Sequence, residues 1–373
     1  MKLTVPRQDL TDAVAWATRV AGGRAQLPAL TGVLLEAADG RLVMRATDLE
    51  VTAEVGVDAR IEAPGTALLA ARLLAQLVAR LPDGDVTLAD DGERVRIECG
   101  RAKFRVRRIP AEDFPTPPAL TAEAIEGSVK AHAFSRLVTQ VGRAAAAGED
   151  ARAVLTGVNL EAADGRLTAA ATDTYRLAAR SVAFERAVEG AAIVPARALA
   201  EVDKAIAAGG GADVTVVLDA GQAQFRVGER TLTTRLVEGP FPNYRSLLPD
   251  ASEVTVVVER APLAEALQRA QVVASAAANT PVQLSFSEGG LELAVQNTEA
   301  GDASEQLPAQ VEGGPLEIAF NPRYLQDGLE AAGTERIRFE LRDGLRAAVI
   351  RPVAPDGEDA DDLTYLLMPM RVS

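Results

Sequence analysis

The sequence has 373 residues but only one cysteine, one histidine and one tryptophan, and aromatic residues make up 4% of it. The single cysteine, Cys99, excludes an intrachain disulfide, and the single histidine, His132, has no second histidine with which to hold a metal. Because aromatic rings are scarce, the cores must consist of leucine, valine and alanine. Hydrophobic residues at 48% and charged residues at 25% are nevertheless typical of a globular chain, here of two or three domains.

Positive charge is also in short supply. The formal net charge is -14 and the pI is near 4.8, which by itself argues against binding nucleic acid or an anionic membrane surface. The start, MKLTVPRQDL, lacks the apolar run of a signal peptide, and no segment reaches the length of a membrane span. We therefore expect a cytoplasmic protein without membrane contact.

Patterns that carry catalysis or cofactors are missing as well. The sequence has no GxxxxGK phosphate loop and no GxGxxG turn. His132 lies at an expected helix start without a nucleophile partner, and Cys99 is expected to be a small buried residue in a strand. Asp48 and Asp173 stand in two copies of the motif ATD, which favours a turn or cap role over catalysis. We expect no enzyme, no metal and no cofactor.

The sequence contains an internal repeat. Residues 30–48 read LTGVLLEAADGRLVMRATD, and residues 155–173 read LTGVNLEAADGRLTAAATD, at a constant offset of 125. A fainter third copy, LSFSEGGLELAVQN, covers residues 284–297. Each copy predicts a β-hairpin, because two alternating apolar runs flank a turn. Gly40, Gly165 and Gly289 correspond, and Gly40 would supply a positive φ.

Helices recur in the same register. Phe134, Leu137, Val138 and Val141 form one apolar stripe at helical spacing, and a second helix follows later in each third. A helix with a single stripe covers one side of a sheet. The sequence thus predicts an α+β fold of three tandem copies, each made of two β-α-β-β-β units with two helices packed on one face of antiparallel sheets. The expected domains are residues 1–120, 127–248 and 253–373.

Charge is segregated along the chain. Six expected helix windows together carry a net charge of +5, so the rest carries -19; the windows are 7–24, 71–81, 129–147, 194–208, 258–280 and 320–332. For any one helix the simple interpretation is a solvated face. If two chains closed into a ring lined by about twelve helices, the opening would be about 28 Å wide. A DNA duplex of about 20 Å would pass through it.

Stretches spread over the whole chain resemble one family, the bacterial sliding clamp or beta subunit of DNA polymerase III. They are ATDLEV (46–51), RRIPAEDFP (107–115), ATDTYRLA (171–178), LVEGPFPNYRSLLP (236–249), FNPRYLQDGL (320–329) and YLLMPMRVS (365–373). The composition is most similar to clamps of actinobacteria. The resemblance implies a head-to-tail homodimer, a six-domain ring around duplex DNA and no catalysis. It further implies that the DNA polymerase III alpha subunit, the clamp loader and repair polymerases dock through short motifs.

The resemblance also implies the docking site, a hydrophobic pocket between the second and third domains. Its residues carried over to this sequence are Leu155, Thr172, Thr174, Tyr175, Arg176, Leu177, Pro242, Leu247, Leu366, Leu367, Met368, Pro369, Met370 and Arg371. Flexible methionine side chains suit a site that accepts several peptides. The family often has Gly-His where this chain has Thr174 and Tyr175, which enlarges one wall of the pocket.

Further residues are implied at the DNA and at the dimer interface. The resemblance places Arg24, Arg152 and Arg197 at the DNA, and the positive helix windows add Arg72 and Arg143 to this set. At the interface, Phe104 of one copy is expected to meet Val272 and Val273 of the other. Relatives often have basic residues in the stretch 274–283, and this chain has none. That weak charge of the third domain, together with the change to Thr174 and Tyr175, leaves an alternative open. In it the chain is a specialised clamp paralogue, a peptide- or inhibitor-binding ring without the replication role.

Overall fold

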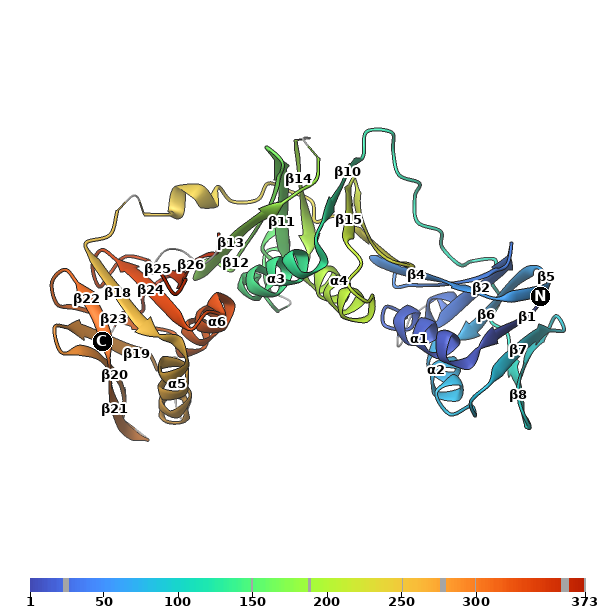
Figure 1. Cartoon of the computed structure of the whole chain (residues 1–373), viewed down its shortest axis with the longest axis horizontal. Coiled ribbons are helices and arrows are strands. Elements are labelled where there is room, and N and C mark those ends of the chain that lie inside the picture. The colour runs from blue at the N-terminus through green and yellow to red at the C-terminus, as the bar shows by residue number, and fades with distance from the viewer. Residues whose placement is uncertain are drawn as a thin grey trace. The chain divides into compact units, whose positions relative to one another are not determined.

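The computed structural model describes residues 1–22, 27–148, 150–186, 189–249, 251–275, 280–298, 300–356 and 362–371. The chain divides into two compact units, and Figure 1 labels their helices and strands. Unit 1 comprises residues 1–134 and 197–236, and unit 2 comprises residues 135–196 and 237–373. Within the described ranges, no helix combines the length and apolarity needed to cross a membrane.

In the described residues of the first third, two α-helices and one 3-10 helix lie among nine strands. Its elements are β1 (Lys2–Pro6), α1 (Arg7–Ala17), η1 (Pro28–Thr31), β2 (Gly32–Ala38), β3 (Arg41–Thr47), β4 (Val51–Asp58), β5 (Arg60–Ala63), β6 (Gly65–Ala70), α2 (Ala71–Val78), β7 (Asp85–Asp90), β8 (Arg94–Cys99) and β9 (Ala102–Arg107).

The middle third repeats this order without a counterpart of β5. Its elements are β10 (Ile125–Val129), α3 (Ala131–Val141), η2 (Gly142–Ala144), η3 (Ala153–Leu155), β11 (Gly157–Ala163), β12 (Arg166–Thr172), β13 (Arg176–Ala183), β14 (Gly190–Pro195), α4 (Ala196–Ala208), β15 (Val214–Leu218), β16 (Gln222–Val227), β17 (Arg230–Arg235) and η4 (Tyr244–Leu247).

The last third follows the first, with β22 in the place of β5. Its elements are β18 (Val254–Glu259), α5 (Arg260–Ala274), β19 (Val282–Ser287), β20 (Gly290–Asn297), β21 (Gly301–Leu307), β22 (Ala309–Glu312), β23 (Leu316–Phe320), α6 (Pro322–Ala332), β24 (Arg336–Leu341), β25 (Ala348–Val353) and β26 (Thr364–Leu367). Each third therefore holds two β-α-β-β-β units, as predicted.

The predicted hairpins are β2–β3, β11–β12 and β19–β20. Gly40 has φ +78° and Gly165 has φ +70°, so glycine does supply the left-handed backbone in the first two turns. In the third hairpin the positive φ of +116° falls on Gly290, not on Gly289. The repeat in the sequence thus preserves the hairpin but not the backbone conformation of its turn.

Unit 1 contains two antiparallel sheets. One has the strand order β5-β1-β7-β8-β9, so β9 is an edge strand, and the other has the order β10-β15-β16-β17-β4-β3-β2-β6. The second sheet contains strands of both the first and the middle third of the chain. They are joined because β17 pairs with β4, with Leu232 opposite Ala53. We call this pairing joint 1.

Unit 2 is built the same way. One sheet has the order β14-β11-β12-β13-β26-β25-β24-β18-β22, and the other has the order β21-β20-β19-β23, which leaves β21 at an edge. Here β13 of the middle third pairs with β26 of the last third, with Ala178 opposite Tyr365. We call this pairing joint 2.

The helices are anchored by equivalent apolar residues. Leu10, Phe134 and Leu263 are fully buried on the first helix of each third, and Leu74, Leu199 and Leu325 are at most 1% exposed on the second. Phe134 packs on Phe225 of β16, with 5.7 Å between ring centroids. These six residues give a common frame for comparing the three thirds. Cys99 is buried in β8, as predicted.

Candidate functional site

The turn that follows β12 is held by its own side chains. The Asp173 carboxylate accepts from the backbone N–H groups of Tyr175 and Arg176, both at 3.0 Å, and the Thr172 hydroxyl donates to the Arg176 carbonyl at 2.7 Å. Asp48 accepts from two backbone N–H groups in the same way after β3. The turn role predicted for the two ATD motifs is confirmed.

Both turns place a residue other than glycine in the left-handed region. Thr174 has φ +79° and Leu49 has φ +81°. A β-branched side chain is rarely found there because its Cβ meets the backbone carbonyl. Threonine in place of the family's glycine at position 174 therefore introduces backbone strain. The hydrogen bonds of the turn keep Thr174 in this strained conformation.

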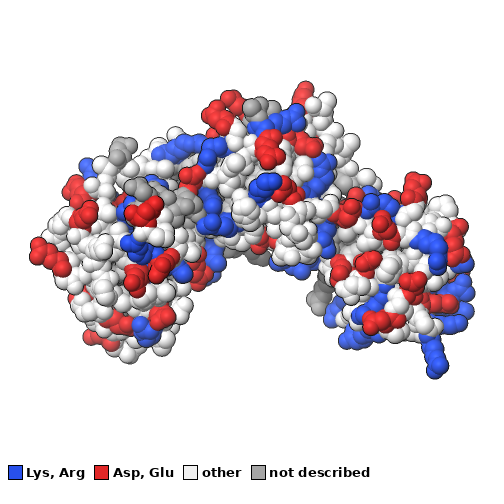
Figure 2. Space-filling view, in the orientation of Figure 1, with Lys and Arg blue, Asp and Glu red and all other residues white. Residues whose placement is uncertain are grey.

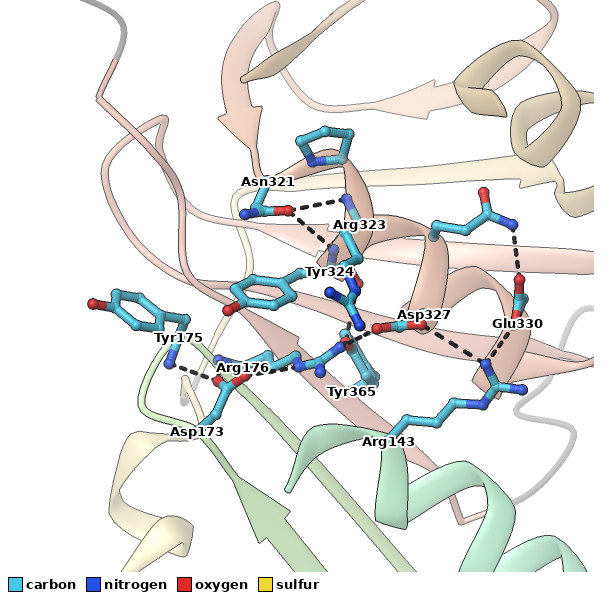
Figure 3. Close-up of polar contacts among 12 residues, drawn as sticks. Arg143, Asp173, Tyr175, Arg176, Asn321, Arg323, Tyr324, Asp327, Glu330 and Tyr365 are labelled. Carbon is cyan, nitrogen blue, oxygen red and sulfur yellow. Dashed lines mark hydrogen bonds and ion pairs between the residues drawn. The ribbon is translucent and has the colours of Figure 1, made fainter. Parts of the chain in front are cut away.

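Arg176 occupies the centre of the site (Figure 3). Its side chain is 8% exposed, its Nε lies 3.0 Å from Asp173, and its Nη1 pairs with Asp327 of α6. The guanidinium carbon lies 4.4 Å from the ring centroid of Tyr324. Burial lowers the pKa of Arg176, but Tyr365 and Asp327 raise it, and the net shift is upward. The guanidinium is therefore a permanent cation that ties the turn to α6.

Helix α6 is capped at its start and is linked near its end to the 3-10 turn η2. The Asn321 carboxamide caps it by accepting from the N–H groups of Arg323 and Tyr324, at 3.0 and 3.4 Å. Further along, Glu330 pairs with Arg143, which also lies 3.8 Å from Asp327 (Figure 3). Hydrogen bonds from Gln326 and Arg143 lower the pKa of Glu330 below its ordinary value.

Tyr175, which departs from the family pattern, forms one wall of the site together with Tyr324. The ring of Tyr175 stacks on that of Tyr324, with 6.3 Å between centroids and 24° between planes (Figure 3). Tyr175 is 61% exposed, and its carbonyl accepts from the Met368 N–H at 2.9 Å. The backbone of the C-terminal segment is thus attached to an exposed aromatic platform.

A cavity of about 510 Å³ opens beside this platform. Its lining includes four residues predicted for the pocket, Leu155, Thr174, Tyr175 and Arg176, together with Arg152, which we predicted at the DNA. Cavities of this size hold a few amino-acid side chains. Its charged lining suits a polar part of a ligand.

An apolar cluster forms the other half of the site. Leu177, Tyr244 and Leu366 are at most 5% exposed and belong to one core cluster. Phe241, Leu248 and Ala347 pack against that cluster. Nearby in the chain, Leu247 is 54% exposed, Leu345 is 79% exposed and Met368 is 42% exposed. Large exposed apolar side chains beside a buried cluster are typical of a docking surface.

The predicted pocket residues all lie in unit 2, but they do not all reach the surface. Leu367 is fully buried, and Thr172 is 4% exposed with its hydroxyl used in the turn. Pro242, Pro369 and Met370 are half-buried, and Arg371 is exposed. The sequence missed Tyr324 and Asp327, although both stand in the quoted segment FNPRYLQDGL. Their spacing of three residues on α6 was the available signal, since it places them on one face.

The arginines predicted at the DNA have different surroundings. Arg72 and Arg152 are exposed, whereas Arg197 pairs with Asp48 at 2.8 Å and Arg143 pairs with Glu330. Arg24 lies outside the described residues. Of the interface set, Phe104 is 41% exposed, Val272 is 74% exposed and Val273 is half-buried. In the described part of the chain, no three His, Cys, Asp or Glu side chains gather as metal ligands do.

Three repeated two-helix thirds, joined by shared sheets, define a protein of the three-domain clamp class. Family models match the chain in three segments, named the N-terminal (1–118), central (128–243) and C-terminal (245–371) domains of the DNA polymerase III beta subunit. The chain belongs to this family, the bacterial sliding clamps of DNA replication.

Individual relatives agree with the family models. The beta sliding clamp of Streptomyces coelicolor is 37% identical over the full length of both chains. That of Micrococcus luteus is 35% identical over 84% of this chain and its own whole length. Both organisms are actinobacteria, as the sequence predicted. Among solved structures, the chain is similar to a Pseudomonas aeruginosa sliding clamp bound to griselimycin. The two sequences are 30% identical, and the structures superpose with a TM-score of 0.93 over the full length of both chains. These matches support the sliding-clamp function over the specialised paralogue.

Proposed function

We propose that two copies of this chain join head to tail into a ring of six domains that encircles duplex DNA in the cytoplasm. The domains are residues 1–120, 127–248 and 253–373. The ring holds no cofactor and performs no catalysis. Its role is to keep a polymerase on its template by a tether that does not grip the DNA.

The observation that carries the ring is a pair of free sheet edges. In joint 1, β4 pairs with β17. Strand β4 is the third strand after the first helix of its domain, and β17 is the last strand of the next domain. Joint 2 repeats this arrangement with β13 and β26. The strands in the same positions of the remaining pair are β21 and β9, and both lie at sheet edges. Unpaired edges are ready templates for pairing with another chain, so β21 of one copy pairs with β9 of the next.

The two intrachain joints also give the register. When the repeated strands are aligned, Phe104 of β9 is equivalent to Leu232 of β17 and Tyr365 of β26. Ala303 of β21 is equivalent to Ala53 of β4 and Ala178 of β13. Leu232 and Tyr365 are buried by their joints, whereas Phe104 is 41% exposed in the single chain. Phe104 therefore lies opposite the partner's Ala303, which brings Arg105 opposite the partner's Asp302.

Charge on the two edges favours this pairing. The strands β8 and β9 and their turn carry six basic residues, namely Arg94, Arg96, Arg101, Lys103, Arg105 and Arg107. Lys and Arg side chains gather over the end of unit 1 where β8 lies (Figure 2). Strand β21 carries Asp302 and Glu305 and no basic residue. Opposite charges across strands favour one orientation of two edges, and a heterologous contact that closes after two copies makes a ring.

Duplex DNA is the occupant that the helices suit. The six helix windows carry the positive excess of an otherwise acidic chain, so an acidic exterior repels DNA from other surfaces. Arg72 is exposed and is the strongest DNA contact of the predicted set. Arg24 and Arg152 stay in that set as sequence predictions, although Arg152 also lines the cavity beside Tyr175. Arg143 and Arg197 contribute less, because each already pairs with a carboxylate.

Partner proteins dock in unit 2. The apolar cluster around Leu177 and Leu366 takes the hydrophobic side chains of a clamp-binding motif, and the exposed Leu247 and Met368 close over them. The cavity beside Tyr175 takes the polar end of the same peptide. The partners are the DNA polymerase III alpha subunit, the clamp loader and repair polymerases.

Two measurements test the proposal together. Sedimentation equilibrium is expected to give twice the 39.1-kDa chain mass, and the loaded protein is expected to stay on nicked circular DNA and leave after linearisation. Retention on both DNA forms would indicate binding without encirclement. A stable monomer would rule out the ring.

A further inference from the structure

The four methionines of the chain differ in how far solvent reaches them. Met44 of β3 is fully buried, Met1 and Met370 are half-buried, and Met368 is 42% exposed. A thioether is the apolar side-chain group that oxidants attack most readily, and exposure gives a dissolved oxidant access to it. Met368 is therefore the methionine that a peroxide reaches most easily.

Met368 lies on the face of the sheet that carries the apolar cluster of unit 2. Strand β26 pairs with β13, with Leu366 opposite Leu177, and both residues belong to that cluster. The Met368 N–H extends this ladder by one residue, since it donates to the Tyr175 carbonyl at 2.9 Å. Side chains alternate along an extended strand, so Met368 shares a face with Leu366, two residues before it.

Apolar side chains border Met368 on this face. Ala348 of β25 is opposite Leu367, which places Ala347 opposite Met368. Ala347 packs against the apolar cluster, as do Phe241 and Leu248. Oxidation would place a sulfoxide oxygen, a polar acceptor, among these groups. A docked apolar peptide would then bury that oxygen without a hydrogen-bond donor, which is unfavourable.

We propose that Met368 is a site of reversible oxidation that turns peptide docking off. The inference rests on the docking site proposed above and adds its regulation. Hydrogen peroxide transfers one oxygen atom to the Met368 sulfur and leaves as water, so the thioether loses two electrons and the peroxide gains them. Methionine sulfoxide reductases reverse the step with two electrons from a dithiol, and the oxygen leaves as water.

Docking and oxidation oppose each other in this arrangement. A bound peptide covers Met368 and keeps peroxide from its sulfur, whereas a sulfoxide at the same place weakens the peptide. A clamp that holds a partner therefore keeps Met368 reduced, and an empty clamp exposed to peroxide stops recruiting partners until a reductase acts on it.

The experiment compares peptide affinity before and after peroxide in the full-length chain and in the matched variants Met368→Leu and Met370→Leu. The probe is a labelled clamp-binding peptide without methionine, cysteine or tryptophan, added after the peroxide has been removed. We expect the Kd to rise about tenfold on oxidation in the unmodified chain and in Met370→Leu, and to change less than about twofold in Met368→Leu. Reductases for both sulfoxide epimers should restore the affinity of the unmodified chain.

Mass spectrometry of the same samples locates the added oxygen. We expect it on Met368 well before Met44 or Cys99, both of which are buried. With peptide at ten times its Kd, only about one chain in eleven is free, so oxidation of Met368 should be roughly tenfold slower.

The outcomes separate the two proposals. A reduced chain that does not bind the peptide overturns the docking site and this inference with it. If the reduced chain binds, equal affinity of the oxidised chain overturns this inference alone. The inference is also overturned if Met370→Leu rather than Met368→Leu removes the response to peroxide, or if bound peptide leaves the oxidation rate of Met368 unchanged.

Discussion

Arg176 and Asp327 come from different thirds of the chain and form an ion pair beneath the ring of Tyr324. Asp173 holds the same guanidinium from the other side at 3.0 Å. The turn after β12 and the helix α6 are thereby fixed relative to each other within unit 2. The exposed Tyr175 owes its position to this pair, since it is the residue directly before Arg176.

Removing Arg176 is expected to destabilise unit 2. Arg176→Ala leaves two carboxylates and the Tyr365 hydroxyl without their shared partner, at a cost of about 3 kcal/mol in free energy of unfolding. Urea denaturation followed by circular dichroism measures it. The control is Arg166→Ala, which breaks an exposed pair with Asp362 and is expected to cost less than about 1 kcal/mol. An equal loss of unfolding free energy in both variants would show that the buried ion pairs of Arg176 contribute no more than an exposed pair.

Thr174→Gly is expected to stabilise the protein by about 1 kcal/mol. Glycine adopts the φ of +79° without the Cβ clash that threonine suffers. Thr255→Gly in β18, where the backbone is extended, is the control and should destabilise by a similar amount. Thermal unfolding of the two variants checks the signs. A lower melting temperature for Thr174→Gly would mean that the turn is not strained.

Acid is expected to weaken the ion pair between Arg19 and Glu201 of α4, which connects the same two thirds of the chain as joint 1. Burial acts to raise the pKa of this carboxyl, but hydrogen bonds from Arg19 and Lys204 outweigh it, and the pKa lies below its ordinary value of 4.5. The pair therefore contributes stability above pH 4.5 that is lost as pH falls through the lower, folded-state pKa. Glu201→Gln should flatten the fall of the urea midpoint between about pH 5 and pH 3. Glu288→Gln in an exposed turn is the control, and an unchanged slope in Glu201→Gln would contradict the expectation.

Tyr175 is expected to set part of the peptide affinity. Tyr175→Ala removes an exposed ring from the wall of the cavity. It should weaken a clamp-binding peptide by roughly five- to tenfold, since truncating an aromatic anchor of a binding site costs about 1 kcal/mol or more. Tyr175→Phe keeps the ring and should bind within about twofold of the unmodified chain. Fluorescence polarisation with a labelled peptide measures both, with the unlabelled peptide as competitor. A full-affinity Tyr175→Ala would place the peptide elsewhere.

Local features were predictable from the sequence because they depend on short spacings. The six helices, the hairpins and the turn role of Asp48 and Asp173 follow from periodicity and repetition. The pairing of β4 with β17 was not predictable in this way. Apolar and polar residues alternate in both strands as in ordinary hairpin strands, and no local sequence pattern indicates a partner strand in another third of the chain. Nor did the sequence reveal that Asp327 meets Arg176, 151 residues away. Such contacts depend on how sheets join, which only the three-dimensional fold specifies.

The ring itself is tested most directly by a disulfide across the predicted strand pair. In the proposed register Lys103 of one copy lies opposite Ser304 of the next, so Lys103→Cys/Ser304→Cys should oxidise to a closed, covalent dimer that stays on nicked circular DNA even in denaturant and leaves linear DNA. Lys103→Cys/Leu307→Cys, about 10 Å out of register, should not form it. A ladder of larger oligomers, equal crosslinking in both variants, or release of the oxidised dimer from circular DNA would contradict the closed ring.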